Sequence, residues 1–259
     1  MIDIFPSRAV AISIANFNIH WYGLMYMLAF LLAFYLLPRI QKWRGLSLSR
    51  DDWSSLLALG VIGVIAGGRL GFVLFYEPVF YLTNPVEIIK VWNGGMSSHG
   101  GLIGVGIAIV FFSWKKGISI FSLLDVVVIP GAIGLAMGRM GNLINGELYG
   151  IESAVPWAMQ FAEADGLRHP TQIYAIMKNL IIAGVCTVYI QSATSKRGQV
   201  FALFLIMYGL LRYIVEYFRE QPYGIYDLGV VMMSRGQLLT VPIILFGVLV
   251  WFVTIRKSV

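Results

Sequence analysis

Residues 53–76 read WSSLLALGVIGVIAGGRLGFVLFY and hold a single charged residue, Arg69. A helix of about 20 apolar residues is long enough to cross the hydrocarbon core of a bilayer, so this stretch predicts a transmembrane span. Similar apolar runs recur along the chain and predict about seven spans. Their expected bounds are residues 20–37, 53–76, 99–114, 123–137, 171–190, 199–218 and 237–255.

Composition supports the same class of protein. Of the 259 residues, 58% are hydrophobic and 12% are charged, whereas soluble domains carry about 25% charged residues. We therefore expect an all-α polytopic membrane protein that forms one domain over residues 1–259. The net charge of +6 does not indicate a nucleic-acid partner, because the basic residues form short clusters between apolar runs, where membrane topology explains them.

The basic residues also predict an orientation. Short connections on the cytoplasmic side of a membrane protein are enriched in Lys and Arg. Alternate connections here hold ten basic residues: Arg39, Lys42, Arg44, Arg50, Lys115, Lys116, Lys196, Arg197, Arg256 and Lys257. The opposite side holds six, spread over longer segments: Arg8, Lys90, Arg139, Arg168, Arg219 and Arg235. The N-terminus is thus expected outside and the C-terminus in the cytoplasm, with binding and chemistry in the long outer connections 77–98 and 140–170.

Three basic residues fall inside predicted spans: Arg69, Lys178 and Arg212. A charge at mid-membrane costs at least about 2.5 kcal/mol, so each needs a partner. Glu216 follows Arg212 by four residues and shares its helical face, which predicts either a structural ion pair or a guanidinium held ready for a phosphate. Arg69 lies among glycines that allow close helix packing, and bracing and ligand binding both remain open for it.

Two polar segments flank the predicted spans. Residues 138–150 read GRMGNLINGELYG and form the densest polar cluster, expected just outside the fourth span. Its glycines leave backbone N–H groups available to an anion. His99 opens the third span within SSHGGLIG, and histidine is a residue type that can serve as a proton acceptor in catalysis. The His spacings typical of metal sites are missing from the sequence, so no metal and no cofactor is expected.

These segments resemble the bacterial prolipoprotein diacylglyceryl transferase family. The likeness rests on the 138–150 segment together with five motifs that follow in family order: HWYGLMY (20–26), GGR (67–69), SHGG (98–101), HPTQIY (169–174) and RYIVE (212–216). The chain departs from the family pattern at Ala175, where an acidic residue is frequent, and at Arg235, where an uncharged residue is frequent.

The resemblance implies an enzyme of the bacterial inner membrane. It would transfer the diacylglyceryl group of phosphatidylglycerol to the lipobox cysteine thiol of a prolipoprotein signal peptide, and it would release glycerol-1-phosphate on the periplasmic side. His99, Arg139 and Arg212 are the expected catalytic residues. The expected substrate-binding residues are Arg139, Asn142, Asn145, Glu147, Gly150, Tyr22, Arg69, Glu216 and Gln172.

Two other functions fit parts of the same pattern. A small-solute transporter would explain buried charges, but it usually shows repeat symmetry, and the polar residues here concentrate on one side. A non-catalytic scaffold that binds anionic lipid would need the arginines but gives no role to His99. The sequence leaves open the oligomeric state, the acyl-chain preference, the general base and the order of substrate entry.

Overall fold

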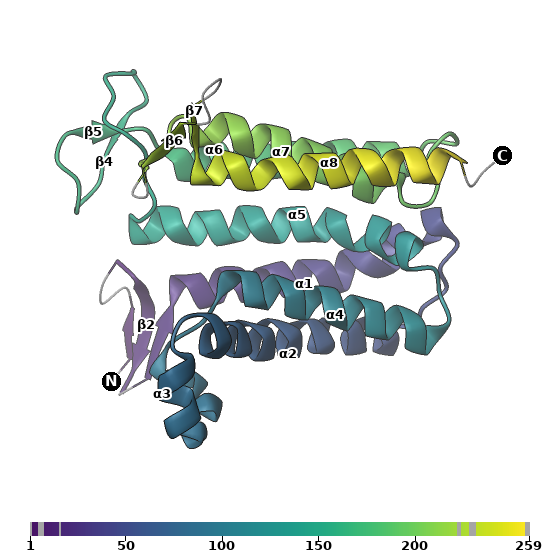
Figure 1. The fold of residues 1–259 in the computed structure, drawn as a ribbon, viewed down its shortest axis with the longest axis horizontal. Helices are drawn as coiled ribbons and strands as arrows, with labels where there is room; N and C mark the ends of the chain where they lie inside the picture. The colour runs from purple at the N-terminus through teal and green to yellow at the C-terminus, as the bar shows by residue number, and fades with distance from the viewer. Residues whose placement is uncertain (1, 5–7, 16, 222–223, 228–231, 257–259) are drawn as a thin grey trace. The chain divides into compact units, whose positions relative to one another are not determined.

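The fold is described from a computed structural model, which describes residues 2–4, 8–15, 17–221, 224–227 and 232–256. Lys257, one of the basic residues counted above, lies outside them. The chain is mostly helical (Figure 1). The long helices are α1 (Trp21–Ile40), α2 (Arg50–Phe75), α4 (Ser98–Lys116), α5 (Ile120–Asn145), α6 (Thr171–Ile190), α7 (Gln199–Glu216) and α8 (Arg235–Arg256).

Among the described residues, six helices are long and apolar enough to cross a membrane: α1, α2, α5, α6, α7 and α8. They coincide with six of the predicted spans. The predicted span 99–114 is also helical, as α4, but α4 does not belong to these six. The sequence therefore predicted the positions of the helical segments well. Six of the seven predicted spans are supported as candidate membrane spans among the described residues, and the seventh is supported as a helix.

Two predicted helix ends were wrong. The first helix was expected to stop before Pro38, but α1 includes this residue in its last turn. A proline costs one backbone hydrogen bond, which a helix in an apolar environment tolerates when its neighbours compensate. The fourth helix was expected to end near residue 137, but α5 continues to Asn145. Its glycines weaken helix propensity without preventing a helix that packing supports.

The polar connections contain short strands that the prediction of an all-α protein missed. A three-stranded antiparallel sheet precedes α1 and has the order β1 (Ile2–Ile4), β2 (Val10–Ile14), β3 (Phe17–His20). Two further antiparallel pairs are β4 (Met159–Gln160) with β5 (Leu167–Arg168), and β6 (Ile225–Asp227) with β7 (Met232–Ser234). The long connection after α2 instead forms α3 (Pro78–Thr83), η2 (Pro85–Ile89) and η3 (Val91–Asn93).

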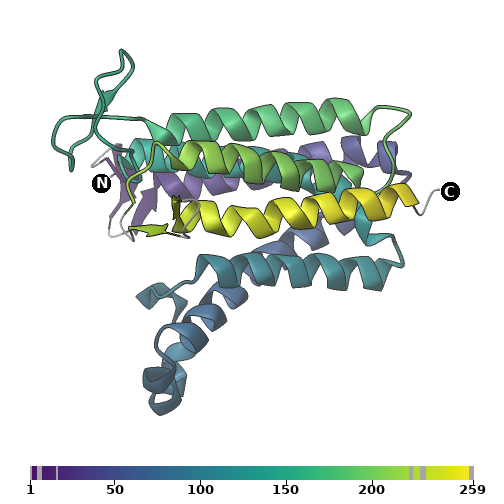
Figure 2. The same cartoon turned by 45° about the horizontal axis from the view of Figure 1, so that its top comes forward.

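The chain divides into two compact units, and each is described by itself. The first unit contains residues 1–36 and 125–259, and the second contains residues 37–124. In the first unit, α6 packs on α7 and α7 packs on α8 (Figures 1 and 2). Asp125, fully buried, accepts hydrogen bonds from the N–H groups of Gly198 (2.7 Å) and Phe201 (2.8 Å). Its carboxylate thus satisfies open donors where α7 begins.

The second unit is built on a close contact between α2 and α4 (Figures 1 and 2). Gly63, Gly67 and Gly71 recur every four residues along α2, and they face Gly100 and Gly104 of α4. A Cβ at Gly63 would lie 2.6 Å from the Gly104 carbonyl oxygen, and one at Gly71 would lie 2.9 Å from the Gly100 Cα. The two backbones therefore touch, which confirms the expectation that the glycines around Arg69 allow close helix packing.

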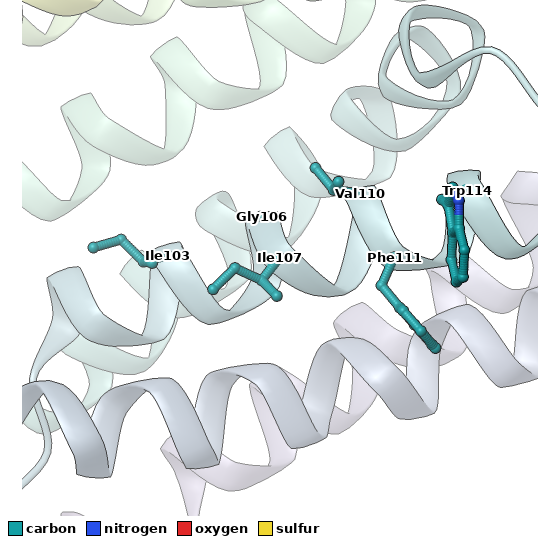
Figure 3. Close-up of a pocket in the computed structure, with 6 residues that line it drawn as sticks. All are labelled: Ile103, Gly106, Ile107, Val110, Phe111 and Trp114. Carbon is teal, nitrogen blue, oxygen red and sulfur yellow. The ribbon is translucent and has the colours of Figure 1, made fainter.

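The other side of α4 is open and apolar. A cavity of about 560 Å³ lies along this helix, and Figure 3 draws the residues that line it. Its lining residues are Ile103, Gly106, Ile107, Val110, Phe111 and Trp114. Gly106 has no atom within 4 Å of the place where a Cβ would stand, so the glycines of α4 differ sharply in the room that surrounds them.

Candidate functional site

The segment 138–150 is helical over its first half. Arg139, Asn142 and Asn145 occupy the last two turns of α5 at spacings of three residues, so they share one face of the helix. The helix ends at Gly146, whose φ is 78°. The N–H groups of Gly146 and Glu147 donate back to the carbonyls of Leu143 and Asn142, the pattern of a Schellman cap.

Hydrogen bonds connect these side chains and Glu147 in series. The Arg139 guanidinium donates to Asn142 Oδ1 (3.3 Å), and Asn142 Nδ2 donates to Glu147 Oε1 (2.7 Å). Asn145 Nδ2 donates to the same carboxylate oxygen (3.3 Å). Asn142 is buried and uses both ends of its amide, so it orients Arg139 with respect to Glu147.

The turn after α5 is held from α6. Gln172, 1% exposed, donates from Nε2 to the Glu147 carbonyl (2.7 Å), and the Thr171 hydroxyl donates to the Leu148 carbonyl (2.9 Å). Gly150 then pairs with Arg219 in an isolated β-bridge, and a Cβ there would overlap the Phe218 carbonyl oxygen. Gln172 and Gly150 therefore position the loop, a contribution that their residue types alone do not reveal.

The N-terminal segment holds the same turn from another direction. Arg8 Nε donates to the Ile144 carbonyl (2.6 Å), and its Nη2 donates to the Leu143 carbonyl (3.3 Å). These carbonyls lie in the last turn of α5, where no further helical turn follows to supply N–H donors, and the Leu143 carbonyl also accepts the Gly146 N–H. The Arg8 guanidinium also lies against Gly146, where a Cβ would be 2.9 Å from its Cζ.

Arg212 in α7 and Arg219, three residues after the end of α7, contribute two more guanidinium groups. Glu216 Oε2 lies 3.1 Å from Arg212 Nη2 and 3.2 Å from Arg219 Nη1. The predicted pairing of Arg212 with Glu216 is thus confirmed, and Arg219 joins it. The Glu216 side chain is 5% exposed, while Arg212 and Arg219 are 21% and 22% exposed. One buried carboxylate therefore holds two partly accessible cations.

Arg139 belongs to the same cationic cluster. Its guanidinium interacts electrostatically with Arg212 and Arg219, although α5 and α7 are far apart in sequence. Among the described residues, Arg139 forms no ion pair of its own. Three guanidinium groups thus gather around a single directly paired carboxylate, and this excess of positive charge makes the cluster a candidate site for an anion.

Two tyrosines of α1 complete this side of the site. Tyr22 packs against Gly141, where a Cβ would lie 2.7 Å from its ring, and the Tyr26 hydroxyl is close to Gly138. The two hydroxyls are 3.2 Å apart, and Tyr26 interacts electrostatically with Arg139. The glycines of α5 therefore let aromatic hydroxyls approach the helix beside the guanidinium.

Two buried oxygens near the cluster lack donors. Asn145 Oδ1 and Gln172 Oε1 have no hydrogen-bond partner among the described residues. The opposite end of each amide donates to an oxygen atom, which fixes the orientation of both amides. A buried acceptor without a donor is costly, so these oxygens suit a ligand that carries hydroxyl groups.

The second unit holds His99 and Arg69. His99 is exposed in the first turn of α4, which Ser97 caps by accepting the Gly100 N–H (3.3 Å). Arg69 is 4% exposed and uses all five of its N–H donors on backbone carbonyls. These are the carbonyls of Glu87, Ile88, Lys90, Gly94 and Gly95. This geometry favours bracing of the connection between α2 and α4 over ligand binding.

Sequence reasoning did not predict several residues that lie in or next to the site. Lys178 lies over the Tyr208 ring, 4.1 Å from its centroid, and neither residue was expected in the site. Tyr208 precedes Arg212 by four residues, a spacing that could have placed it on the arginine face. Arg8 gave no such signal, because its partners depend on the fold of the N-terminal sheet. Among the described residues, no group of three His, Cys, Asp or Glu side chains is arranged to hold a metal ion.

Comparison with known proteins settles the family. The family model described as prolipoprotein diacylglyceryl transferase matches residues 9–253. The chain belongs to this family. Phosphatidylglycerol–prolipoprotein diacylglyceryl transferases of Bordetella avium (strain 197N) and Polynucleobacter necessarius (strain STIR1) are similar to it. They are 43% and 44% identical over 253 and 255 residues, and both alignments cover 96% of this chain and 95% of the relative.

A more distant member supports the same assignment. The transferase of the Wolbachia strain wRi is 40% identical over 247 residues, which cover 93% of both chains. The family model covers α1 to α8 almost completely, so the match does not depend on one motif. With six candidate spans among its described residues, this member of the diacylglyceryl transferase family is a multi-pass membrane protein.

Proposed function

We propose that this protein transfers the diacylglyceryl group of phosphatidylglycerol to the lipobox cysteine of a prolipoprotein in the bacterial inner membrane. The observation that carries the proposal is the gathering of Arg139, Arg212 and Arg219 around one directly paired carboxylate, Glu216. Such a cluster suits a lipid whose head group carries a phosphate. Family membership supports the reaction, since the names of the relatives specify both substrates.

The reaction balances without a cofactor. The cysteine sulfur forms a bond to the glyceryl carbon that carries the phosphate ester, and the bond between this carbon and the ester oxygen breaks. The oxygen keeps the electron pair and leaves on glycerol-1-phosphate, while the thiol proton passes to a base. The phosphodiester carries one negative charge and the released monoester carries nearly two, so hydrogen-bonded cations favour the departure of the leaving group.

The residues of the site receive the following roles in this proposal. Arg139 and Arg212 hold the phosphate, and Asn142 positions Arg139 through their hydrogen bond. The unpartnered oxygens of Asn145 and Gln172 accept hydroxyl hydrogens from the glycerol head group. Tyr22 lines the same site from α1, and Glu147, Glu216 and Gly150 keep the cationic side chains and the loop in place.

His99 is proposed as the base that takes the thiol proton, on the strength of the family motif around it. We expect His99→Gln to lower transfer about 100-fold near neutral pH. The difference in rate between His99→Gln and the parent enzyme should become smaller as the pH rises past about 8.5, because the substrate thiol then ionises without a base. A pH series of initial rates, measured beside the parent enzyme, checks this. Parent-like rates of the variant near neutral pH would remove His99 as the base.

The membrane topology follows the same proposal. α4 is taken as a seventh span, so the N-terminus lies in the periplasm and the C-terminus in the cytoplasm. The excess of basic residues in alternate short connections supports this orientation. The cationic cluster then faces the periplasmic side, where lipobox cysteines become accessible, and both units belong to one integral membrane domain.

One assay tests the function directly. Purified protein is incubated with phosphatidylglycerol labelled in its diacylglyceryl part, not in its head group, and with a peptide that contains a lipobox cysteine. We expect label on the peptide through a thioether that resists alkaline hydrolysis, together with one equivalent of glycerol-1-phosphate. A peptide with serine in place of the cysteine serves as the control. If proteoliposomes showed solute flux and the peptide gained no label, the result would instead favour a transporter.

A further inference from the structure

Lys178 is the most unusual charged residue of the first unit. It lies in the middle of α6 and is 6% exposed, so its side chain does not reach the aqueous surface. Its Nζ donates to Asn179 Oδ1 (2.7 Å) and lies 4.1 Å from the centroid of the Tyr208 ring. The ammonium is therefore held in a fixed place by a neutral amide and an aromatic face.

Within the part of the chain that the structure describes, the charged groups that act on Lys178 have its own sign. Its ammonium interacts electrostatically with Arg212 and Arg139, and within the described residues it forms no ion pair with a carboxylate. A buried cation beside other cations is costly in a membrane protein. The contacts of Lys178 with Asn179 and Tyr208 do not offset this cost, because an amide oxygen and a π face carry only partial charges. An anion that enters the cluster would offset it.

We infer that Lys178 is a further phosphate-binding residue, which stabilises the leaving phosphate as the bond between the glyceryl carbon and the ester oxygen breaks. This inference rests on the proposed function. The phosphodiester substrate brings one negative charge, which the guanidinium pair of Arg139 and Arg212 can hold. The departing monoester gains a second charge, and the ammonium of Lys178 is the additional cation that meets it.

The timing of this contact predicts a specific kinetic signature. An interaction that is stronger in the transition state than in the bound substrate raises kcat and leaves KM nearly unchanged. Lys178 should therefore contribute little to the binding of phosphatidylglycerol. It should contribute strongly to the binding of the product, because glycerol-1-phosphate carries the second charge in its ground state.

The test compares Lys178→Met with the parent enzyme in the transfer assay. We expect kcat to fall about 10- to 100-fold, with the KM for phosphatidylglycerol changed by less than about 3-fold. The inhibition constant of added glycerol-1-phosphate should rise about 10-fold. Lys178→Arg should recover part of kcat. Lys115→Met, at the exposed end of α4, makes the same chemical change away from the cluster and should leave all three values unchanged.

Thermal stability separates this role from a structural one. Removing a buried charge that lacks a carboxylate should leave the unfolding midpoint of Lys178→Met unchanged or raise it, while activity falls. A lower midpoint with a proportionate loss of active enzyme would overturn the inference in favour of a packing role. If Lys178→Met is not recovered in folded form, Lys178→Gln provides the same kinetic comparison.

The outcomes also distinguish the two proposals. Transfer by the parent enzyme with parent-like kcat and product inhibition in Lys178→Met would overturn the role of Lys178 and leave the proposed function standing. A rise in KM alone would likewise overturn it, since that result indicates uniform binding of substrate and transition state. A parent protein that transfers no diacylglyceryl group would overturn the proposed function, and the inference with it.

Discussion

Arg139→Gln is expected to lose about 100- to 1000-fold in kcat/KM for phosphatidylglycerol, the range seen when a preorganised donor to a developing anion is removed. Gln keeps a side-chain N–H donor at this position, and Asn142 stays bonded to Glu147, so the end of α5 should stay folded. The loss therefore reports the missing charge. Initial rates at varied lipid concentration, with the precursor peptide saturating, measure it.

Two further variants sharpen the result. Arg139→Lys keeps the charge but loses the planar fork, and it should fall between the parent and Arg139→Gln. Arg50→Gln makes the same change at an exposed residue that begins α2 and should behave like the parent. Near-normal transfer by Arg139→Gln would mean that the cluster holds the phosphate without this residue, and the proposed clamp would be wrong.

Gly104→Val is expected to destabilise the second unit by at least about 1–3 kcal/mol, the usual cost of overpacking. A Cβ at position 104 would overlap the Gly63 carbonyl oxygen and lie 3.2 Å from the Gly67 Cα. Neither obstacle is a side chain that can rotate away, so α2 and α4 must move apart. Thermal unfolding in detergent, followed by circular dichroism or by monodisperse recovery after heating, measures the effect.

Gly106→Val is the matched control for this prediction. It lies two residues further along α4, on the open side that Figure 3 displays, and no atom stands within 4 Å of its Cβ position. The two variants share the same change in helix propensity and side-chain volume. Equal unfolding midpoints for Gly104→Val and Gly106→Val would contradict the close contact of the two backbones.

The sequence predicted the helical segments because each requires a long apolar run, and such runs are local in sequence. It predicted less well where tertiary contacts decide. The glycines of residues 138–150 suggested a loop, but packing against Tyr22 and Tyr26 accompanies a helix as far as Asn145. The short strands of the polar connections escaped prediction for a similar reason, since two or three residues are too few for a periodic pattern.

The site shows the same division. The pairing of Arg212 with Glu216 followed from their spacing on one helix and is confirmed. The association of Arg139 with Arg212 and Arg219, and of Lys178 with Tyr208, depends on which segments are neighbours in the fold. The bracing geometry of Arg69 depends on five carbonyls from a connection with no regular repeat. These contacts join residues that are far apart in sequence, so local sequence patterns do not predict them.

The hydrogen bonds of Arg8 to the end of α5 connect the polar N-terminal segment to the helix that carries Arg139. Arg8 occupies the carbonyls of Leu143 and Ile144, one turn beyond the guanidinium that is proposed to grip the phosphate. Loosening of the three-stranded sheet before α1 would therefore remove one of the contacts that stabilise the last turn of α5, while the apolar helices could stay inserted. If this turn holds the phosphate as proposed, transferase activity would then fall without dissociation from the membrane, and an assay of membrane integration alone would not detect the change.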